Sequence, residues 1–446
     1  MKNKQIINTL KKGFPKSEHL KEETIIIIGA GIAGLTAGQI LHHSGAKVII
    51  LEAQNLLGGR IKALENFTDS PIELGAEFVH GENSAWFQLL KKNKIKLENI
   101  EDKFWEFYSI NGEFWSEEDL LKTEEFKDLI RIKDNLYSYR GKEMSIKAYL
   151  EQTEELADEG IAVLENWLSA EYGDSLKNIS LPAFARSGRA WQAGQKNYTL
   201  PKNTFFEVLH ITFENILSLI QYEKIVNEID YSDTIIKVKT IDNQVFEANK
   251  VILTVPISIL QKNKIMFKPD LPLRRKEAIN HLKIAPVIKV ILRFSQNFWG
   301  NELSGFYSAY PHIINFYPSA KTEKEHILTA FLAGKEGYYF QELEKNKKNE
   351  GINFLLELLC DTFHNRIPNF SFEKSYLIDW SEIPYIEGGY SVPASNSYFW
   401  RKKLALPLKN QLFWAGEATS ARHSASVNGA LETGFRAAKQ VWIGEE

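Results

Sequence analysis

A run of β-branched residues, Thr24–Ile28, leads directly into the string Gly29-Ala30-Gly31-Ile32-Ala33-Gly34, and this junction constrains the fold more than any other feature. Uninterrupted β-branched stretches are typical of parallel strands that are buried on both faces. Residues Leu35–His43 then predict a helix, and Lys47–Leu51 predict a second strand that ends in Glu52. A GxGxxG string alone is weak evidence, but between a strand and a helix it predicts a βαβ unit that binds a dinucleotide.

Each glycine of the string has a physical role in such a unit. Gly29 permits the tight turn, Gly31 lets the backbone approach a pyrophosphate, and Gly34 lets the helix pack closely on its strand. The helix N-terminus then faces the phosphates. Glu52 lies 18 residues past Gly34, a separation at which an acid accepts hydrogen bonds from a ribose, and an acid there disfavours NADP. The alternative for Glu52 is a solvated strand end.

Composition bounds the remaining possibilities. The 446 residues are 44% hydrophobic and 25% charged, which predicts a globular protein of two domains. A formal net charge of −3 argues against a nucleic-acid partner. The single cysteine, Cys360, excludes an internal disulfide and a multi-thiolate zinc site, and we predict no metal site.

No targeting or membrane segment is expected. Residues Met1–Lys21 lack an apolar signal-peptide core and form either a disordered leader or an accessory helix. The most apolar stretch, Ile25–Leu41, is interrupted by glycines and is short for a membrane span. We therefore expect a cytoplasmic protein that needs no membrane.

Further motifs distinguish one dinucleotide from another. Gly58-Gly59-Arg60 follows Glu52 closely, and a plain NAD dehydrogenase has no reason to place it there. The sequence resembles the flavin-containing amine oxidase family, which includes monoamine oxidases, polyamine oxidases and flavin-dependent histone demethylases. The resemblance covers nearly the whole chain. It rests on the GxGxxG unit, Gly58-Gly59-Arg60, Leu74-Gly75-Ala76, Val251–Pro256, Gly388–Ser391 and the stretch from Leu412 to Ala438.

The resemblance implies an α/β fold with an FAD-binding Rossmann-like domain of the glutathione-reductase type and an interleaved α+β substrate domain. The FAD-binding domain would be assembled from residues 20–83, 200–262 and 404–446, after a leader of residues 1–19. The substrate-binding domain would comprise residues 84–199 and 263–403.

The resemblance also assigns residues to the cofactor, FAD. Val226 would lie against the adenine, Glu417 near the ribityl and phosphate region, and the helix from Val427 would point its N-terminus at the flavin pyrimidine ring. The full set of expected cofactor-binding residues is Gly29, Gly31, Ile32, Ala33, Gly34, Glu52, Ala53, Gly58, Gly59, Arg60, Gly75, Ala76, Glu77, Phe78, Val226, Thr254, Pro256, Trp380, Tyr390, Gly416, Glu417, Ser426, Val427 and Ala430.

Two residues are expected to take part in the chemistry. Lys289 interrupts an apolar strand-like run, and at its position the family has a lysine that holds a water against flavin N5. Without that context, it would be a strand lysine on a solvated face. His80 stands where animal polyamine oxidases carry a histidine and plant ones a glutamate, near the amine; its alternative is a structural histidine. Glu77 and Glu82 flank His80 and could attract a cationic amine, but exposed loop carboxylates are common, so neither is assigned a role in binding the amine.

The sequence departs from the family at three places. Tyr390 occupies the position of the cysteine to which monoamine oxidases attach FAD, so a noncovalent cofactor is expected. Ser391 and Ser426 occupy the positions of the two tyrosines that sandwich the substrate in those enzymes. The missing aromatic cage favours a slender, flexible amine. The chain also has no room for the long helical insertion of the histone demethylases.

The leading hypothesis is therefore a polyamine-type or other aliphatic amine oxidase that transfers a hydride from the amine α-carbon to flavin N5. The imine would be hydrolysed to an aldehyde, and O2 would be reduced to hydrogen peroxide. An L-amino acid oxidase would need an arginine as carboxylate clamp, for which Arg186, Arg189 and Arg293 are available. A flavin desaturase and a non-catalytic FAD-binding scaffold stay open, as do the identity of the amine, the bond cleaved and the choice between monomer and homodimer.

Overall fold

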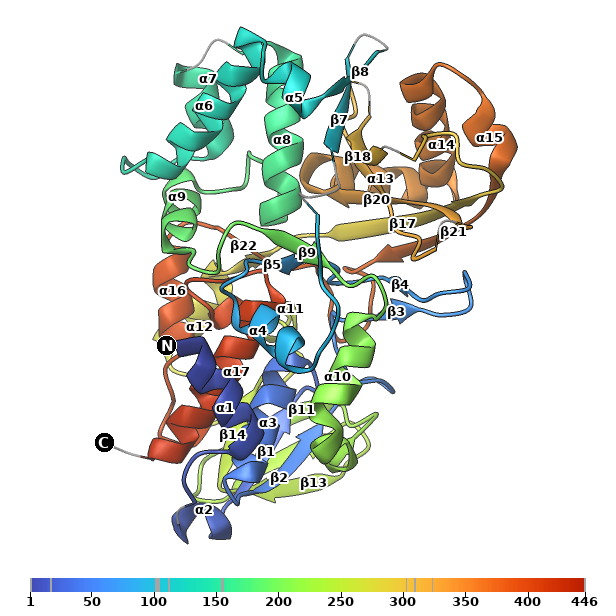
Figure 1. The fold of residues 1–446 in the computed structure, drawn as a ribbon. Coiled ribbons are helices and arrows are strands. Elements are labelled where there is room, and N and C mark those ends of the chain that lie inside the picture. The colour runs from blue at the N-terminus through green and yellow to red at the C-terminus, as the bar shows by residue number, and fades with distance from the viewer. Residues whose placement is uncertain are drawn as a thin grey trace.

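The computed structural model describes residues 2–16, 18–100, 105–110, 113–153, 156–301, 303–308, 310–322 and 324–444. The lower part of Figure 1 holds a parallel five-stranded sheet in the order β10-β2-β1-β14-β23. Its strands are β1 (Thr24–Ile28), β2 (Lys47–Leu51), β10 (Ile220–Gln221), β14 (Lys250–Leu253) and β23 (Leu412–Trp414). The predicted strands around the glycine string are thus confirmed, and distant segments complete their sheet.

The isoleucines of β1 alternate between two cores. Ile25 and Ile27 pack with residues of the helices α3 (Ile32–His43) and α17 (Val427–Ile443). Ile26 and Ile28 pack on the opposite face with a four-stranded sheet. Burial on both faces explains why the strand is apolar without interruption. The second sheet has the order β13-β12-β11-β15 and consists of Val245–Ala248, Ile236–Thr240, Val226–Asp230 and Met266–Lys268.

Helix α3 begins at Ile32, inside the glycine string and three residues before the predicted start at Leu35. The first turn of the helix therefore belongs to the loop motif itself. Gly34 is buried in this turn, where the helix lies against the loop that it follows.

The N-terminal segment forms an accessory helix, one of the two expected possibilities. Helix α1 (Lys2–Lys12) buries Ile6 and Leu10 in the same core as α3 and α17. Phe14 then stacks on Trp442 with a ring-centroid distance of 4.8 Å. Figure 1 shows the blue N-terminal and red C-terminal helices packed together at this end of the molecule.

A seven-stranded sheet lies at the upper right of Figure 1, in the order β21-β17-β20-β19-β18-β7-β8. Alternate residues of β17, among them Ile288 and Val290, pack with Leu355 and Leu359 of α14. Ile291 lies in a different cluster, with Leu74 and Trp380. The strands in sheet order are Phe372–Asp379, Val287–Phe294, His326–Ala333, Asn315–Pro318, Leu303–Tyr307, Trp105–Ile110 and Glu113–Ser116.

The remaining elements are three small sheets and the other helices. A three-stranded sheet contains β5 (Val79–His80), β9 (Asn197–Thr199) and β6 (Glu98–Asn99). The two-stranded pairs are β3 (Ala63–Leu64) with β4 (Ile72–Glu73), and β16 (Lys283–Ile284) with β22 (Ser391–Val392). The other helices are α2 (Glu18–Glu22), α4 (Ala85–Lys92), α5 (Glu117–Leu120), α6 (Glu124–Ser138), α7 (Ile146–Thr153), α8 (Asp158–Tyr172), α9 (Leu181–Ala190), α10 (Phe205–Phe213), η1 (Glu214–Leu219), α11 (Ile257–Gln261), α12 (Leu273–His281), α13 (Gly334–Asn346), α14 (Glu350–Phe363), α15 (Ile367–Ser371), α16 (Ser397–Leu404) and η2 (Glu417–Thr419).

The α/β fold class with a Rossmann-like parallel sheet is confirmed, while the exact division of the chain into two domains stays a prediction. Among the described residues, no helix combines the length and apolar character needed to cross a membrane. The same residues hold no cluster of side chains able to bind a metal ion.

Candidate active site

The glycine string forms a tight junction between β1 and α3. A Cβ on Gly34 would lie 2.0 Å from the Gly29 carbonyl oxygen, so no side chain fits there. Gly29 itself has a φ of 106°, which other residues rarely adopt. Thr254 Oγ1 donates to the carbonyl oxygens of Ile28 and Gly29 at 2.8 and 3.1 Å, which ties the end of β14 to this turn.

Gly31 differs from these positions because nothing in the protein requires a glycine there. Its φ of −72° and ψ of 171° suit any residue, and a Cβ would meet one atom, the Gly58 carbonyl oxygen, at 3.9 Å. Gly31 also caps the N-terminus of α3 without a side-chain hydrogen bond. An open backbone at a bare helix N-terminus fits a pyrophosphate, the group that the sequence predicts for this place.

The Gly58-Gly59-Arg60 loop lies against this cradle. Gly58 forms a β-bridge with Gly31, and its N–H donates to the Ala30 carbonyl oxygen at 2.9 Å. Glu52 closes the other side: its Oε2 accepts from Ala30 N at 2.7 Å and its Oε1 accepts from Gln54 N at 2.8 Å. Burial raises the pKa of Glu52, and the backbone donors oppose that shift. Glu52 is thus a fixed acceptor beside the glycine string, as an acid that binds a ribose has to be.

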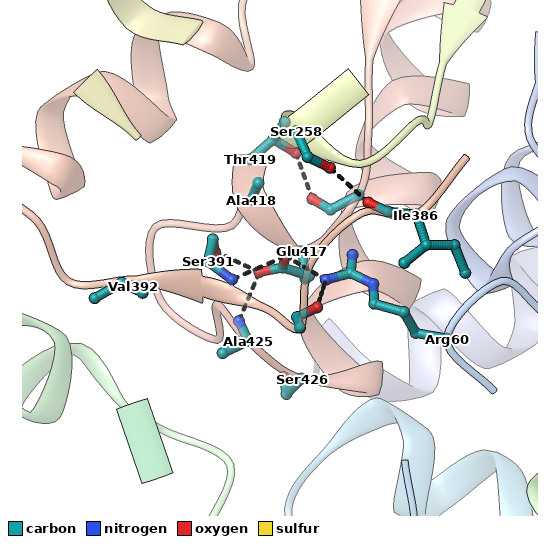
Figure 2. A network of polar contacts seen from close by, with 12 residues as sticks. Arg60, Ser258, Ile386, Ser391, Val392, Glu417, Ala418, Thr419, Ala425 and Ser426 are labelled. Atoms are coloured by element: carbon teal, nitrogen blue, oxygen red, sulfur yellow. Dashed lines mark hydrogen bonds and ion pairs between the residues drawn. The ribbon is translucent and has the colours of Figure 1, made fainter. Parts of the chain in front are cut away.

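Glu417 connects three motifs that the sequence places far apart. Its Oε1 accepts from Arg60 Nη1 at 2.9 Å, and its Oε2 accepts from Ala425 N at 2.9 Å and from the Ser391 hydroxyl. Figure 2 shows the carboxylate at the centre of these contacts. Burial alone would raise the pKa of Glu417, but Arg60 and Arg401 outweigh it, so that the pKa lies below the usual value.

Arg401 is a member of this network that the sequence analysis missed. Its Nη1 donates to Ser391 Oγ at 2.6 Å and to the Ala418 carbonyl oxygen at 3.1 Å, and the side chain is buried. Burial lowers the pKa of Arg401 to about 10. The residues next to Arg401 in the sequence form no recognisable motif. Its hydrogen-bond partners lie on β22 and η2 rather than on its own helix, α16, so the sequence could not indicate them.

The segment after β4 passes between Arg60 and Trp380. A Cβ on Gly75 would lie 1.9 Å from the Arg60 carbonyl oxygen and 3.0 Å from Trp380 Cζ2. Ala76 N donates to the same carbonyl at 3.2 Å, and Trp380 Nε1 donates to the Leu74 carbonyl at 3.2 Å. These contacts fix the direction in which the next residues, Glu77 and Phe78, leave the loop.

Glu77 receives two donors on one oxygen. Lys289 Nζ donates to Glu77 Oε2 at 2.6 Å and to the Glu73 carbonyl oxygen at 3.2 Å. Tyr317 Oη donates to Glu77 Oε2 at 2.9 Å. Lys289 is 2% exposed, so it is not a lysine on a solvated strand face. The structure thus joins two predicted site residues, Lys289 and Glu77, and adds Tyr317, which the sequence analysis missed.

His80 lies on the continuation of the same segment. Its Nδ1 is 2.8 Å from Asn197 Oδ1, and its ring is 6.3 Å from that of Phe78, which is in turn 5.6 Å from the Tyr317 ring. The His80 side chain is accessible to solvent, yet protein surrounds it closely enough for burial to lower its pKa.

Ser391, Ser426 and Tyr390 are engaged with the protein. The Ser391 hydroxyl bonds Glu417 and Arg401, whereas Ser426 Oγ caps α17 by accepting from Gly429 N at 3.0 Å. Tyr390 Oη donates to the Ala170 carbonyl oxygen at 2.5 Å. Gly173 packs closely on its ring, since a Cβ at Gly173 would lie 2.6 Å from Tyr390 Cε2.

Glu171, beside Ala170, was not expected at the site. It hydrogen bonds with the hydroxyls of Tyr172 and Tyr137, and burial raises its pKa. The charge of Glu171 also acts on Tyr390, whose pKa is raised by burial first and by this carboxylate second. Nothing in the local sequence distinguishes Glu171 from an ordinary helix-terminal acid, so only the fold could identify it.

Two further parts of the chain hold expected cofactor-binding positions. Val226 is buried at the start of β11, and a small pocket between the two motifs is lined by Arg60, Val255, Pro256, Ala415, Gly416 and Glu417. The three arginines considered as a carboxylate clamp have protein partners instead. Arg189 Nη1 donates to Tyr137 O, Arg186 lies over the Tyr398 ring, and Arg293 pairs with Glu373.

Comparisons with known proteins agree with this geometry. A family model described as "Flavin containing amine oxidoreductase" matches residues 32–191 and 215–442. Polyamine oxidase 4 of Oryza sativa subsp. japonica is 27% identical over 94% of this chain and 88% of its own length. Lysine-specific histone demethylase 1 homolog 3 of Arabidopsis thaliana is 28% identical over 95% of this chain, and lysine-specific histone demethylase 2 of Homo sapiens is 28% identical over 96%. The chain spans 30% and 54% of the lengths of these two demethylases.

Solved structures share the fold. Cyclohexylamine oxidase from Brevibacterium oxydans IH-35A has a TM-score of 0.80 at 18% identity and covers 94% of this chain and 98% of its own. Wild-type putrescine oxidase bound to putrescine has a TM-score of 0.78 at 19% identity and covers 94% and 99%.

Proposed function

Because the chain belongs to the flavin-containing amine oxidoreductase family and so uses FAD, we propose that it oxidises a slender aliphatic amine of the polyamine type. When bound, FAD would supply the redox chemistry, as the acceptor of a hydride from the α-carbon of the amine and as the donor of electrons to O2, with hydrogen peroxide as the product. Hydrolysis of the imine then gives an aldehyde. The protein has to bind the cofactor, present the amine as a free base and keep the reacting groups away from bulk water.

The cofactor would be held without a covalent bond. The open backbone at Gly31, the bare N-terminus of α3 and the fixed Glu52 carboxylate would bind the dinucleotide phosphates and ribose. Tyr390 stands at the place of the attachment cysteine, and its hydroxyl is engaged with Ala170. The chain's cysteine, Cys360, is buried in α14.

One observation supports the proposal most strongly, namely the state of His80. Asn197 Oδ1 accepts from His80 Nδ1, so the ring proton sits on Nδ1 and Nε2 keeps its lone pair. Burial lowers the pKa of His80, which favours the neutral ring. A neutral imidazole nitrogen can accept a proton or a hydrogen bond from an ammonium substrate. This is the step that converts a protonated amine into the reactive free base.

The surrounding charge also suits a substrate with more than one amino group. Glu77 has one carboxylate oxygen, Oε1, with no hydrogen bond from any described residue, and Glu171 adds a second acid beside Tyr390. The unoccupied Oε1 of Glu77 and the Glu171 carboxylate would accept hydrogen bonds from the amino groups of such a substrate. The carboxylate of an amino acid would instead meet these acids without an arginine to compensate them, which disfavours the L-amino acid oxidase.

Steady-state product analysis tests the proposal. We expect the FAD-loaded protein to produce hydrogen peroxide and an aldehyde with putrescine, spermidine or spermine. Benzylamine, L-leucine and a dimethyl-lysine peptide are the comparison substrates. An alkene product would instead support the desaturase, and peroxide from the L-amino acid alone would support the amino acid oxidase. If the FAD-loaded protein turns over none of these substrates, the result would support the non-catalytic FAD-binding scaffold.

A further inference from the structure

One carboxylate oxygen of Glu77 accepts hydrogen bonds from two side chains that lie on different strands. Lys289 of β17 approaches Oε2 at 2.6 Å, and Tyr317 of β19 approaches the same atom at 2.9 Å. The lysine is buried, and the Glu77 side chain is 13% exposed. An ammonium group in such a place needs a compensating charge, because burial otherwise favours the neutral amine.

Glu77 is the carboxylate that supplies this charge. The nearest other acid, Glu73, is fully buried, and its Oε1 accepts from Phe205 N at 2.6 Å. Burial raises the pKa of Glu73 to about 8, so Glu73 is mostly neutral at neutral pH. Lys321 is a further cation in this region and bonds the Leu200 and Asn203 carbonyls. Tyr317 stays protonated, because burial and Glu77 raise its pKa well above the usual value.

The hydrogen bonds also orient Lys289. An ammonium group has three N–H donors, and Glu77 Oε2 and the Glu73 carbonyl oxygen accept two of them. The third N–H has no acceptor among the described residues. It is therefore available to a water or to a reacting oxygen, in a direction that the two fixed bonds determine.

We propose that Glu77 is a positioning residue that keeps Lys289 protonated and directs its third N–H into the reaction space. This inference rests on the proposed oxidase function, since Lys289 would act on the negative charge that develops while O2 is reduced. Glu77 would then govern the oxygen-dependent half of the reaction, while amine oxidation would depend on it much less.

The first test does not require catalysis. Thermal unfolding of the protein without FAD is followed between about pH 7 and about pH 9.5 for the wild type, Glu77→Gln, Lys289→Met and the double variant. In Glu77→Gln the buried Lys289 has lost its counter-charge, so burial favours its neutral form in the folded state. The unfolded state then binds more protons, and stability rises with pH. We expect the Tm difference between wild type and Glu77→Gln to narrow as pH rises.

The Lys289→Met background provides the control for this slope. Glu73 titrates in the same pH range, and it responds to Glu77→Gln with or without Lys289. In the Lys289→Met background, the Tm difference that Glu77→Gln causes should therefore no longer become smaller as pH rises through loss of the Lys289 proton. A Tm difference that is constant with pH, or an equal slope in both backgrounds, would overturn the proposal.

The second test follows the reaction of the FAD-loaded enzyme, reduced with dithionite, with O2. For Glu77→Gln we expect the rate of the reaction with O2 to decline from a lower pH than in the wild type, because the buried ammonium group has lost its counter-charge. Glu77→Asp should restore part of the rate. The matched control is Glu373→Gln. Glu373 is the half-exposed ion-pair partner of Arg293, which lies on the same strand as Lys289, and its loss should leave the pH profile unchanged.

Failure of the proposed function can be distinguished from failure of this inference. Dithionite reduces the cofactor without any amine, and the unfolding test needs no cofactor. If no amine is oxidised but both pH effects appear, the Glu77–Lys289 relationship stands and the substrate proposal fails. An unchanged pH profile of O2 reaction in Glu77→Gln would contradict the inference directly.

Discussion

Arg60 Nη1 donates to Glu417 Oε1 at 2.9 Å across 357 positions of the sequence, and the same nitrogen donates to the Gly389 carbonyl oxygen at 2.7 Å. A single guanidinium therefore connects the loop beside the glycine string, the segment before Ser391 and the C-terminal motif. The Glu417 side chain is 6% exposed, so loss of Arg60 would leave a buried carboxylate with less compensation.

Arg60→Met should destabilise the protein by about 3 kcal/mol, because one partner of a buried charge pair is removed and the other stays in place. Urea unfolding measures this change. Lys262→Met is the control, since its pair with Glu387 involves a lysine that is 53% exposed, and its loss should cost under about 1 kcal/mol. Equal effects of the two substitutions would contradict the role of the Arg60–Glu417 pair.

Gly31→Ala and Gly34→Ala should differ in what they damage. A Cβ at position 31 has no protein atom nearer than 3.9 Å, so the FAD-free protein should unfold as the wild type does while FAD binding is lost. A Cβ at position 34 would lie 2.0 Å from the Gly29 carbonyl oxygen and should destabilise the fold by about 2 kcal/mol. Flavin content after purification and unfolding of the FAD-free variants provide the two readouts. If Gly31→Ala binds FAD normally, the cradle lies elsewhere.

Glu73 predicts a pH-dependent stability. Its pKa is raised from 4.5 to about 8 by burial, so the folded state binds more protons than the unfolded state between these values. Stability should therefore fall as pH rises through this range, by up to about 1.4 kcal/mol per pH unit. Glu73→Gln keeps an acceptor for Phe205 N and should remove this slope in denaturant titrations. A slope that survives in Glu73→Gln would have to come from other groups.

His80 predicts the acid side of the activity profile. Burial lowers the pKa of His80 below 6.5, so the neutral ring persists as pH falls through 6.5 and is lost at lower pH. The value of kcat/KM for the amine should follow that titration. His80→Gln should lower kcat/KM about a hundredfold. It should also abolish the decline of kcat/KM at low pH that protonation of His80 causes. An identical pH profile in His80→Gln would show that another group accepts the proton.

The N-terminal helix should contribute to stability rather than to chemistry. Leu10 is 2% exposed and packs in the core shared with α3 and α17. Leu10→Ala should lower the free energy of unfolding by about 3 kcal/mol through lost burial and the cavity left behind. Lys11→Ala, an exposed neighbour, should change it little. The flavin content of folded protein should be the same in both variants.

Local signals explain what the sequence could predict. The strand–glycine–helix unit was recognisable because each of its requirements falls within a short stretch, from Thr24 to Glu52. The expected role of Lys289 came from the family resemblance, and its burial agrees with an internal position. The start of α3 was placed too late because Ile32–Gly34 belong to the loop motif and to the helix at once.

The missing parts depend on long-range contacts. Glu77 and Lys289 are 212 positions apart, and neither has a neighbour in sequence that indicates the pair. Arg401 and Glu171 are ordinary helix residues until the fold brings them to Ser391 and Tyr390. The family resemblance indicates only that Ser391 and Ser426 replace two tyrosines. In the fold, the Ser391 hydroxyl bonds Arg401 and Glu417, and the Ser426 hydroxyl caps a helix.

The most direct test of the central claim is an anaerobic titration of the FAD-loaded protein that follows the absorbance of oxidised flavin. We predict that stoichiometric putrescine, spermidine or spermine bleaches this band rapidly, and that benzylamine and L-leucine do so at least about a hundredfold more slowly. A flavin band that no amine bleaches would contradict the assignment as an amine oxidase. Bleaching by benzylamine or L-leucine in preference to every polyamine would contradict the proposed substrate class.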